Sequence, residues 1–475
     1  MLQIADMLSV RHCSGCLSTI TQETNLNQLV KVMKVLFDIS PIFGGSYYRG
    51  IGAYIRSLLA SVLQNSNEDI HFLISKDYDE GRIEEFTQWL MGRGVAKDRI
   101  HFWTPFVTGY RGFSHENVYK VRVLELYREA VIQAIQPDVV VLSAFFDDSL
   151  LSVKKLSQSI PVAAINYDLI PLMESTKFLK DINFAKWYFD RLDSLLQLDS
   201  IYSISEYSNQ QLRKYISVDV DKLKVIGTGR TIAKAAKSSS IKLANLTKKY
   251  ILFVGSPEDP RKNLDGLLMA IKELPETLRN EYQIVIAGKI DNKFKVAFKS
   301  KIAALGLLED QFVLTGFVSD EELELLYASS SLLVHPAFSE GFGLPVAQAM
   351  AYGIPFACSN TSSLPEVAGR TDVLFSPEDP ISIANVIRKI LTSEALVQDL
   401  KRYGKERIKT FDWDLVSCRL IENVRKLNEI KHGEKIGFEL RPFLDKIRPL
   451  VDLLEDNDKV SLANCLSIDF PNYKL

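Results

Sequence analysis

The strongest candidates for chemistry in this sequence lie in residues 339–345, which read SEGFGLP. Two glycines allow the backbone to approach a ligand closely, and Pro345 suits the first turn of a helix, where no N–H donor is needed. A loop that leads into a helix N-terminus offers free N–H groups and the positive end of the helix dipole to an anion. The Glu340 carboxylate is poorly suited to phosphate but well suited to sugar hydroxyls. These residues therefore indicate a site for an anionic ligand that also carries hydroxyl groups.

A second group consists of Arg261 and Lys262, followed by Asn263, shortly after an apolar run at residues 250–254. Two cations at the junction between a strand and a helix suit a phosphate group, to whose attraction the helix dipole adds. The alternative is an ordinary solvated first turn. Because cations are unfavourable near the positive end of a helix, their presence favours a phosphate site.

The first half of the chain carries weaker candidates at the ends of its own apolar runs. Gly44 and Gly45 follow residues 33–39 and either let the backbone approach a phosphate or form a simple turn. Asp168 follows another apolar run and either orients a substrate or caps the next loop. Ser205, three residues before Ser208, has the position of a helix N-cap. His335, at the end of an apolar run, is interpreted as a structural residue.

The elements that must position these candidates alternate along the chain. Short apolar runs predict buried strands at residues 33–39, 70–74, 101–103, 139–142, 162–165, 201–204, 250–254, 332–334 and 354–358. Helices are predicted at residues 53–63, 83–91, 118–135, 263–271, 346–352, 383–391, 395–408, 414–427 and 443–454. Strands that alternate with helices indicate parallel sheets covered on both faces.

The second half of the chain repeats the first. The residues VLFDIS after Lys34 recur as ILFVGS after Tyr250, and PVAAINYD after Ile160 recurs as PFACSNTS after Ile354. Such a repeat predicts two similar doubly wound α/β domains. Residues 231–249 are rich in Ala, Ser and Lys and are predicted to link them.

Composition narrows the class of protein. The 475 residues, 47% of them hydrophobic, are enough for two or three domains, and the net charge of −2 does not favour nucleic acid as a partner. Five cysteines in so long a chain fit a reducing compartment. No run approaches the roughly 18 apolar residues that span a bilayer, and the N-terminus lacks the pattern of a signal peptide. A cytoplasmic protein is therefore expected, which leaves peripheral docking at the inner face of a membrane open.

The loop around Glu340 resembles the sugar-nucleotide motif of glycosyltransferase family 4, whose members are retaining enzymes with the GT-B fold. The resemblance runs from about Met33 to Leu427. It implies two doubly wound Rossmann-like domains that face a cleft. The expected parts are an N-terminal extension (1–32), an acceptor-side domain (33–230), a linker (231–249), a donor-binding domain (250–410), a crossover helix (411–430) and a C-terminal helical extension (431–475).

The resemblance also implies roles for individual residues. Arg261 and Lys262 would hold the diphosphate of the donor, Glu340 would contact the transferred sugar, and Asp168 would orient the acceptor. The backbone after Glu340 would bind the sugar and phosphate, and the loop at residues 315–319 would meet the nucleobase, although Ser319 there equally suits a helix cap. The residues assigned to donor binding are Gly45, Asn263, Phe317, Val318, Gly341, Phe342, Gly343, Leu344 and Gln348. Glu366, in the sequence LPEV, has no assigned role.

Two positions depart from the family pattern. Gln348 replaces the second Glu of the motif, which binds the ribose, and Tyr167 replaces a His beside the reacting sugar. An amide in place of a carboxylate is expected to weaken donor binding by ~1 kcal/mol or somewhat more. These departures keep two alternatives open, a weakened module that binds a sugar nucleotide or a partner protein, and a sugar-nucleotide epimerase on the same fold.

The sequence therefore predicts an enzyme that moves a sugar, mannose or rhamnose, from a nucleoside-diphosphate sugar to a hydroxyl of a glycan or lipid-linked acceptor. The resemblance implies retention, and the closest pattern is that of surface polysaccharide synthesis. No cofactor is expected besides the donor substrate. No metal is expected either, because the Asp-x-Asp triplets at residues 219–221 and 412–414 do not follow buried strands in glycine-flanked loops. The sequence does not indicate an oligomeric state.

Overall fold

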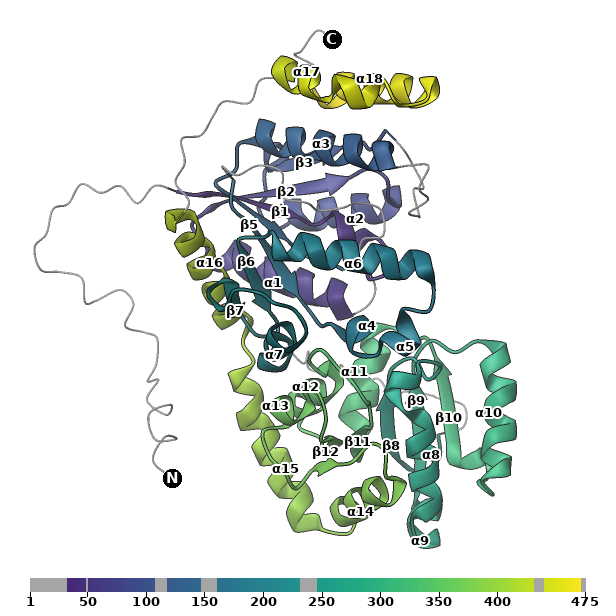
Figure 1. Cartoon of the computed structure of the whole chain (residues 1–475). Helices are drawn as coiled ribbons and strands as arrows, with labels where there is room; N and C mark the ends of the chain where they lie inside the picture. Colours follow the sequence, from purple (N-terminus) through teal and green to yellow (C-terminus); the bar gives the residue numbers. More distant parts are fainter. Residues whose placement is uncertain are drawn as a thin grey trace, which may run out of the picture.

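The computed structural model describes residues 32–47, 50–106, 118–146, 160–230, 246–430 and 440–470. The expected extension at 1–32 and linker at 231–249 lie almost entirely outside these residues. The described chain forms two α/β domains that contact each other, followed by a long helix and two further helices that return to the first domain (Figure 1).

The first domain is built on a parallel sheet of seven strands in the order β3-β2-β1-β4-β5-β6-β7. Its central strands are apolar on both faces, as expected when helices cover both sides. The strands are β1 (Lys34–Asp38), β2 (Asp69–Ser75), β3 (Ile100–Trp103), β4 (Val139–Leu142), β5 (Val162–Asn166), β6 (Ser200–Ser203) and β7 (Leu223–Val225).

The second domain has a parallel sheet of six strands in the order β10-β9-β8-β11-β12-β13. These are β8 (Lys249–Val254), β9 (Tyr282–Ala287), β10 (Phe312–Gly316), β11 (Leu332–His335), β12 (Phe356–Ser359) and β13 (Leu374–Phe375). Six strands of the first sheet have this same order, which is the doubly wound order of dinucleotide-binding folds. The internal repeat in the sequence falls on equivalent strands, since β1 corresponds to β8 and β5 to β12.

Helices cover both faces of each sheet (Figure 1). Those of the first domain are α1 (Gly50–Asn65), α2 (Glu80–Met91), α3 (Val118–Ile135), α4 (Ile170–Met173), α5 (Ser175–Phe178), α6 (Ile182–Leu196) and α7 (Glu206–Tyr215). Those of the second are α8 (Leu264–Glu273), α9 (Glu276–Glu281), α10 (Asn292–Ala304), α11 (Asp320–Ser329), α12 (Leu344–Ala351), α13 (Leu364–Ala368), α14 (Pro380–Leu391) and α15 (Glu394–Arg407).

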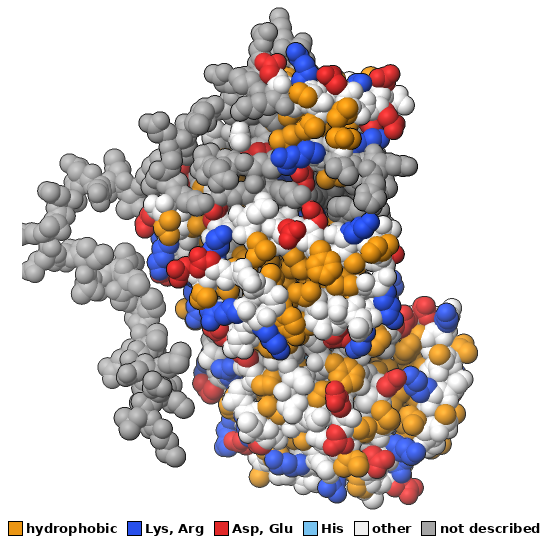
Figure 2. All heavy atoms as spheres, in the orientation of Figure 1, with side chains coloured by type: hydrophobic (Ala, Val, Ile, Leu, Met, Phe, Trp, Pro, Cys, Tyr) orange, Lys and Arg blue, Asp and Glu red, His pale blue; other side chains and the backbone are white. Residues whose placement is uncertain are grey.

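Helix α6 was not predicted from the sequence. Its N-terminus is capped by Asp181, whose carboxylate accepts the N–H groups of Asn183 and Phe184. Its outward face carries exposed Ile182, Phe184 and Phe189. Figure 2 shows hydrophobic side chains gathered over the first domain.

A long helix, α16 (Trp413–Ile430), crosses from the second domain back to α1. Ser61 on α1 is 2.9 Å from both the Asp414 carboxylate and the Ser417 hydroxyl, and Arg425 pairs with Glu68 at 2.6 Å. Helices α17 (Leu440–Val451) and α18 (Asp456–Asp469) then pack on α3 and β3. The chain therefore ends its described part on the domain in which it began.

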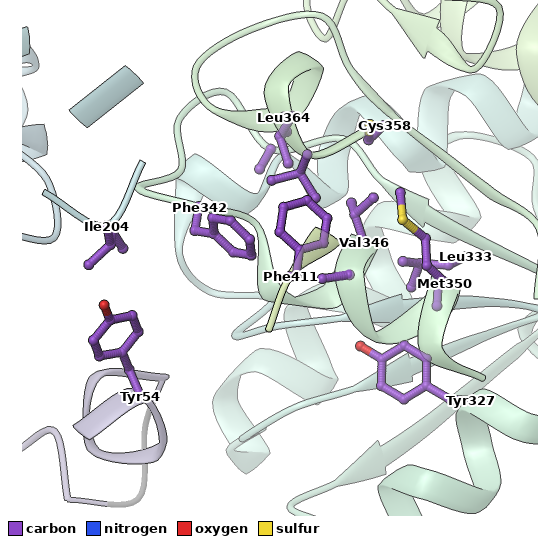
Figure 3. Packing of buried hydrophobic residues seen from close by; sticks show 14 of the residues in the cluster. Tyr54, Ile204, Tyr327, Leu333, Phe342, Val346, Met350, Cys358, Leu364 and Phe411 are labelled. Carbon is purple, nitrogen blue, oxygen red and sulfur yellow. The ribbon is translucent and has the colours of Figure 1, made fainter. Parts of the chain in front are cut away.

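One hydrophobic core runs through the second domain and continues along one face of the first sheet, and another fills the opposite face of that sheet. Phe342 and Phe411 meet edge to face at 5.3 Å within the shared core, and Tyr54 of α1 reaches toward it from the first domain (Figure 3). Among the described residues, no helix has the length and apolar character that a bilayer crossing requires.

Candidate active site

The candidate site lies where strands β8 and β11 end. These strands are neighbours, but the strand order continues from them in opposite directions, which is the position where sheets of this type bind ligands. One loop carries Arg261, Lys262 and Asn263, and the other carries Glu340 to Gly343. The N–H of Phe338 donates to the carbonyl oxygen of Arg261 at 2.8 Å, which ties the two loops together.

Asp259 holds Arg261 in place. Its carboxylate accepts the backbone N–H of Arg261 at 3.0 Å and pairs with the guanidinium at 2.7 Å. Arg261 and Lys262 form a short 3-10 helix with Pro260, and their side chains are 22% and 17% exposed. Both cations are therefore mostly buried yet still reach the surface of the site.

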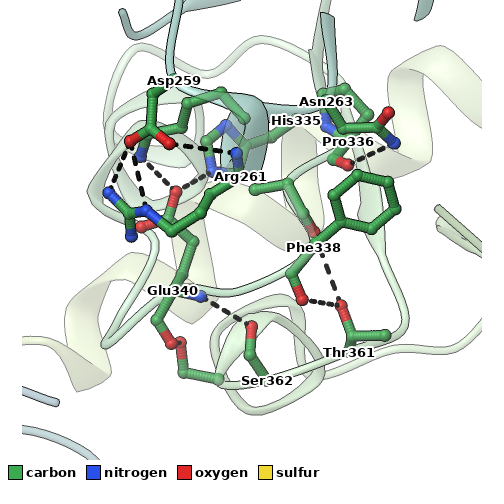
Figure 4. Close-up of polar contacts among 12 residues, drawn as sticks. Asp259, Arg261, Asn263, His335, Pro336, Phe338, Glu340, Thr361 and Ser362 are labelled. Carbon is green, nitrogen blue, oxygen red and sulfur yellow. Dashed lines mark hydrogen bonds and ion pairs between the residues drawn. The ribbon is translucent and has the colours of Figure 1, made fainter. Parts of the chain in front are cut away.

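Glu340 is the centre of a charged cluster (Figure 4). Its Oε1 accepts hydrogen bonds from Lys262 Nζ at 2.5 Å and His335 Nε2 at 2.9 Å. Although burial opposes ionisation, Lys262 and His335 hold the pKa of Glu340 well below its usual range. Because both partners use the same oxygen, Oε2 is left to face a ligand. His335, which sequence reasoning treated as structural, thus contacts a predicted catalytic group.

Three hydroxyls after β12 brace the backbone around Glu340. Thr361 donates to the Phe338 carbonyl oxygen at 3.0 Å, Ser363 donates to the Glu340 carbonyl oxygen at 2.9 Å, and Ser362 accepts the Glu340 N–H at 3.1 Å. Ser362 has a φ of 56°, a left-handed conformation that is uncommon for a residue with a side chain and costs energy. The backbone position of Glu340 is therefore specified from the neighbouring strand.

The Asn263 side chain is hydrogen-bonded within its own domain. It caps α8 in a left-handed conformation, and its Oδ1 accepts the N–H of Gly266. Its amide group donates to the carbonyl oxygens of Pro336 at 3.0 Å and Pro377 at 2.7 Å. Both amide hydrogens are used inside the domain, so this side chain positions the loops, and its predicted contact with the donor stays a prediction.

The glycines after Glu340 allow close approach of the backbone. Gly343 has a φ of 100°, and a Cβ atom there would lie 2.5 Å from Leu364. Within the described residues, the N–H groups of Phe342, Gly343 and Leu344 make no hydrogen bond to a protein acceptor. They remain available to an anion at the N-terminus of α12. The Phe342 side chain points into the core, so only its backbone can serve the predicted site.

The first domain brings Asp168 to the same place. A Cβ atom on Gly341 would lie 3.3 Å from the Asp168 carboxylate and 2.6 Å from the Tyr167 carbonyl oxygen, so only glycine allows this approach. Burial and the nearby Glu340 carboxylate raise the pKa of Asp168, while the Ile170 N–H and Arg261 oppose the shift. Asp168, Arg261, Lys262 and Glu340 therefore form one electrostatic cluster across the two domains.

The other predicted residues lie around this cluster. Phe317 is 80% exposed at the end of β10, and Val318 is half-buried beside it. Gly45 is exposed after β1, and a Cβ there would meet nothing within 4 Å. Leu344 faces Gly50 at the start of α1, and Gln348 is half-exposed on α12.

The Asp-x-Asp triplets have structural partners. Asp219 accepts the N–H of Asp221, and Asp412 accepts the N–H of Asp414, whose own carboxylate binds α1. Within the part of the chain that the structure describes, no three His, Cys, Asp or Glu side chains are grouped as metal ligands.

Sequence reasoning missed Asp259, His335 and the three hydroxyls of residues 361–363 as parts of the site. Asp259, two residues before Arg261, could have been found as a local cap. The contacts of His335 and of residues 361–363 depend on the packing of β8, β11 and β12, and no spacing in the sequence reveals them.

The sequence was compared with protein families and with curated proteins. Residues 235–407 match the family described as "Glycosyl transferases group 1". The chain is 28% identical over 445 residues to the "Serotype-specific mannosyltransferase WbdA" of Escherichia coli, covering 91% of this chain and 53% of that protein. It is 30% identical over 241 residues to the "O-antigen chain mannosyltransferase B" of Escherichia coli, covering 50% of this chain and 62% of that protein. The chain thus spans little more than half the length of these curated relatives.

Solved structures share the fold. Anabaena HepE in complex with UDP and glucose has a TM-score of 0.60 and 15% identity, covering 83% of this chain and 100% of that chain. Sucrose-phosphate synthase from Thermosynechococcus elongatus has a TM-score of 0.62 and 16% identity, covering 84% and 100%. The expected GT-B fold is confirmed, and its second domain matches glycosyl transferases group 1.

Proposed function

We propose that this chain is a retaining, metal-independent glycosyltransferase that moves a sugar, mannose first among the candidates and rhamnose second, from a nucleoside-diphosphate sugar to a hydroxyl group. The acceptor is a glycan or lipid-linked glycan of a surface polysaccharide. The observation that carries the proposal is the convergence of Arg261, Lys262, Glu340 and Asp168 between the two domains. The mannosyltransferases WbdA and B among the relatives support the choice of sugar.

The chemistry follows from these four groups. The bond between the anomeric carbon and the diphosphate breaks, and Arg261, Lys262 and the N–H groups at the start of α12 stabilise the charge that develops on the leaving diphosphate. The acceptor hydroxyl forms the new bond on the same face of the sugar, which gives retention. Asp168 orients this hydroxyl and takes its proton as a carboxylate base.

Glu340 holds the sugar hydroxyls through the oxygen that Lys262 and His335 leave unused. Phe317 and Val318 provide an apolar surface for the base at the end of β10. Ile182, Phe184 and Phe189 are exposed apolar side chains on α6 of the acceptor-side domain, and they support a lipid-linked acceptor or contact with a membrane surface.

The test incubates the protein with GDP-mannose, dTDP-rhamnose and UDP-sugars, with and without EDTA, and follows release of the nucleoside diphosphate. NMR of the product formed with a mannose-terminated oligosaccharide reads the anomeric configuration. We expect release from one donor that is insensitive to EDTA and product with the configuration of the donor.

Four results would contradict parts of this proposal. An inverted product would exclude retention, and loss of turnover in EDTA would exclude metal independence. Donor binding without turnover would favour the weakened module, whereas conversion of the donor to an isomeric sugar nucleotide without acceptor would favour an epimerase.

A further inference from the structure

Two motifs that the proposed reaction does not use meet across the domain boundary. Ser205 and Ser208 begin α7 in the first domain, and Glu366 lies on α13 in the second. The Glu366 carboxylate accepts the N–H groups of Glu206 and Tyr207, each at 3.0 Å. One domain thereby completes the N-terminus of a helix in the other.

The N–H groups in the first turn of α7 are bonded partly by their own domain and partly by the second domain. Ser205, the N-cap, accepts the N–H of Ser208 at 3.0 Å within its own domain. The preceding N–H groups, those of Glu206 and Tyr207, belong to the four that a helix cannot satisfy internally, and Glu366 satisfies both. A carboxylate at this end is also favoured by the helix dipole. If the domains separated, both N–H groups would form hydrogen bonds with water instead.

The hydroxyls of Ser205 and Ser208 in turn donate to the Gly341 carbonyl oxygen of the second domain, and Ser208 also contacts its own domain. Ser205 Oγ lies 2.8 Å from the carbonyl oxygen of Gly341, directly after Glu340 in the donor loop. Ser208 Oγ lies 2.7 Å from the carbonyl oxygen of Tyr167, directly before Asp168. The start of α7 therefore contacts the backbone next to both predicted carboxylates.

The segment that carries Glu366 is also bonded to the backbone of Glu340. Ser363, three residues earlier, donates to the Glu340 carbonyl oxygen. On the other side of α13, Arg407 of α15 donates to the Glu366 carbonyl oxygen at 2.6 Å. Residues 363–366 thus contact α7 of the first domain, the loop that carries Glu340, and α15 of the second domain.

We propose that Ser205, Ser208 and Glu366 form an interdomain clasp that positions the Glu340 loop against the Tyr167–Asp168 turn. The three are positioning residues for the transfer and do not touch the reacting atoms. The role in transfer rests on the proposed function, whereas the formation of the clasp does not. Ser205 and Ser208 are buried, whereas the two bonds of Glu366 lie at or near the surface. Hydrogen bonds near the surface are exchanged for water at little net cost, which suits contacts that must open to admit substrates.

The experiment combines hydrogen exchange with kinetics on the full chain. Exchange at the amides of Glu206 and Tyr207 reads the clasp directly, because these are the hydrogens that Glu366 binds. Glu366→Ala is expected to raise their exchange rate at least about tenfold. Glu366→Gln keeps one acceptor oxygen and should have an intermediate effect. Asp291→Ala, which removes a carboxylate bonded to the N–H of Phe294 at the start of α10, is the matched control and should leave these amides unchanged.

With the donor identified, Glu366→Ala should lower kcat at least about tenfold while Kd for the nucleoside diphosphate stays within about twofold. Ser208→Ala should act in the same direction, and Ser208→Thr, which keeps the hydroxyl, should restore activity. Unchanged exchange in Glu366→Ala would overturn the clasp. Raised exchange with unchanged kcat would overturn its role in positioning. If the wild-type protein turned over no donor, the proposed function would fail, and the exchange rates would still support or overturn the clasp.

Discussion

The two domains share a strand order but use the ends of equivalent strands differently. At the end of β1, Asp38 is fully buried and paired with Arg128 of α3, whose Nε lies 3.1 Å from the carboxylate. At the end of β8, Arg261 and Lys262 are also paired with carboxylates, but they remain partly exposed. The fully buried pair serves the fold, whereas the pairs of Arg261 and Lys262, which still reach the surface of the site, can exchange a carboxylate for the phosphates of a ligand.

This difference has an energetic basis. Breaking a buried ion pair leaves an uncompensated charge in a medium of low polarity, which is costly. A partly exposed pair is weaker because water competes with it. We therefore expect substitutions at the first strand end to affect stability and substitutions at the second to affect donor binding and turnover. The predictions below test that division, in order of expected effect.

Asp38→Ala should lower the free energy of unfolding by about 3–5 kcal/mol, because the buried guanidinium of Arg128 would lose its partner. Denaturant unfolding measures the loss, and the donor affinity of the folded protein should not change. Lys301→Ala, which breaks an exposed pair with Asp265, is the control and should cost less than about 1 kcal/mol. A small loss in Asp38→Ala would mean that the two strand ends do not differ in this way.

Glu340→Ala should reduce the rate of sugar transfer about 100-fold or more, as expected for loss of a preorganised polar group in an active site. Affinity for the nucleoside diphosphate alone should change little, because Glu340 is assigned to the sugar. Transfer assays and calorimetry separate the two quantities. Glu309→Ala, which removes an exposed pair with Lys299 in the same domain, should leave both unchanged. An equal loss of nucleoside diphosphate affinity would assign Glu340 to the diphosphate site.

Lys262→Met should weaken binding of the nucleoside diphosphate about 10- to 100-fold, since a charge-assisted hydrogen bond contributes roughly 1.5–3 kcal/mol. Calorimetry measures the affinity, and its dependence on salt should become shallower. Lys295→Met, at an exposed position on α10, is a charge-matched control. Unchanged affinity would show that the pair of Lys262 with Glu340 is structural, like the pair of Asp38 with Arg128 at the end of β1.

Gln348→Glu should strengthen donor binding about fivefold, because a carboxylate accepts hydrogen bonds from both ribose hydroxyls and adds about 1 kcal/mol. Titration with the donor sugar nucleotide measures the change. Gln398→Glu, exposed on α15, introduces the same charge elsewhere and should have no effect. No gain in Gln348→Glu would place the ribose away from α12.

Much of the site could be predicted because its signals are local. The glycine loop before α12 and the cations before α8 are each contained in a few consecutive residues, and the structure brings both to the ends of neighbouring strands. Helix α6, with buried Trp187, Tyr188 and Leu192 on its inner face, was not predicted from the sequence. The amide bonds of Asn263 could not be predicted because they reach Pro336 and Pro377, far away in sequence.

The sequence by itself determined the parallel doubly wound sheets, through alternating apolar runs and an internal repeat, and it determined which loops carry charge and glycine. Only the tertiary structure decided how those charges are paired. His335 meets Glu340 because β11 and its loop fold back on themselves, and Glu366 meets α7 because two domains touch. Backbone preferences and burial patterns act over a few residues and can be recognised in the sequence. The partner of a charged group depends on which surfaces pack together in the folded protein.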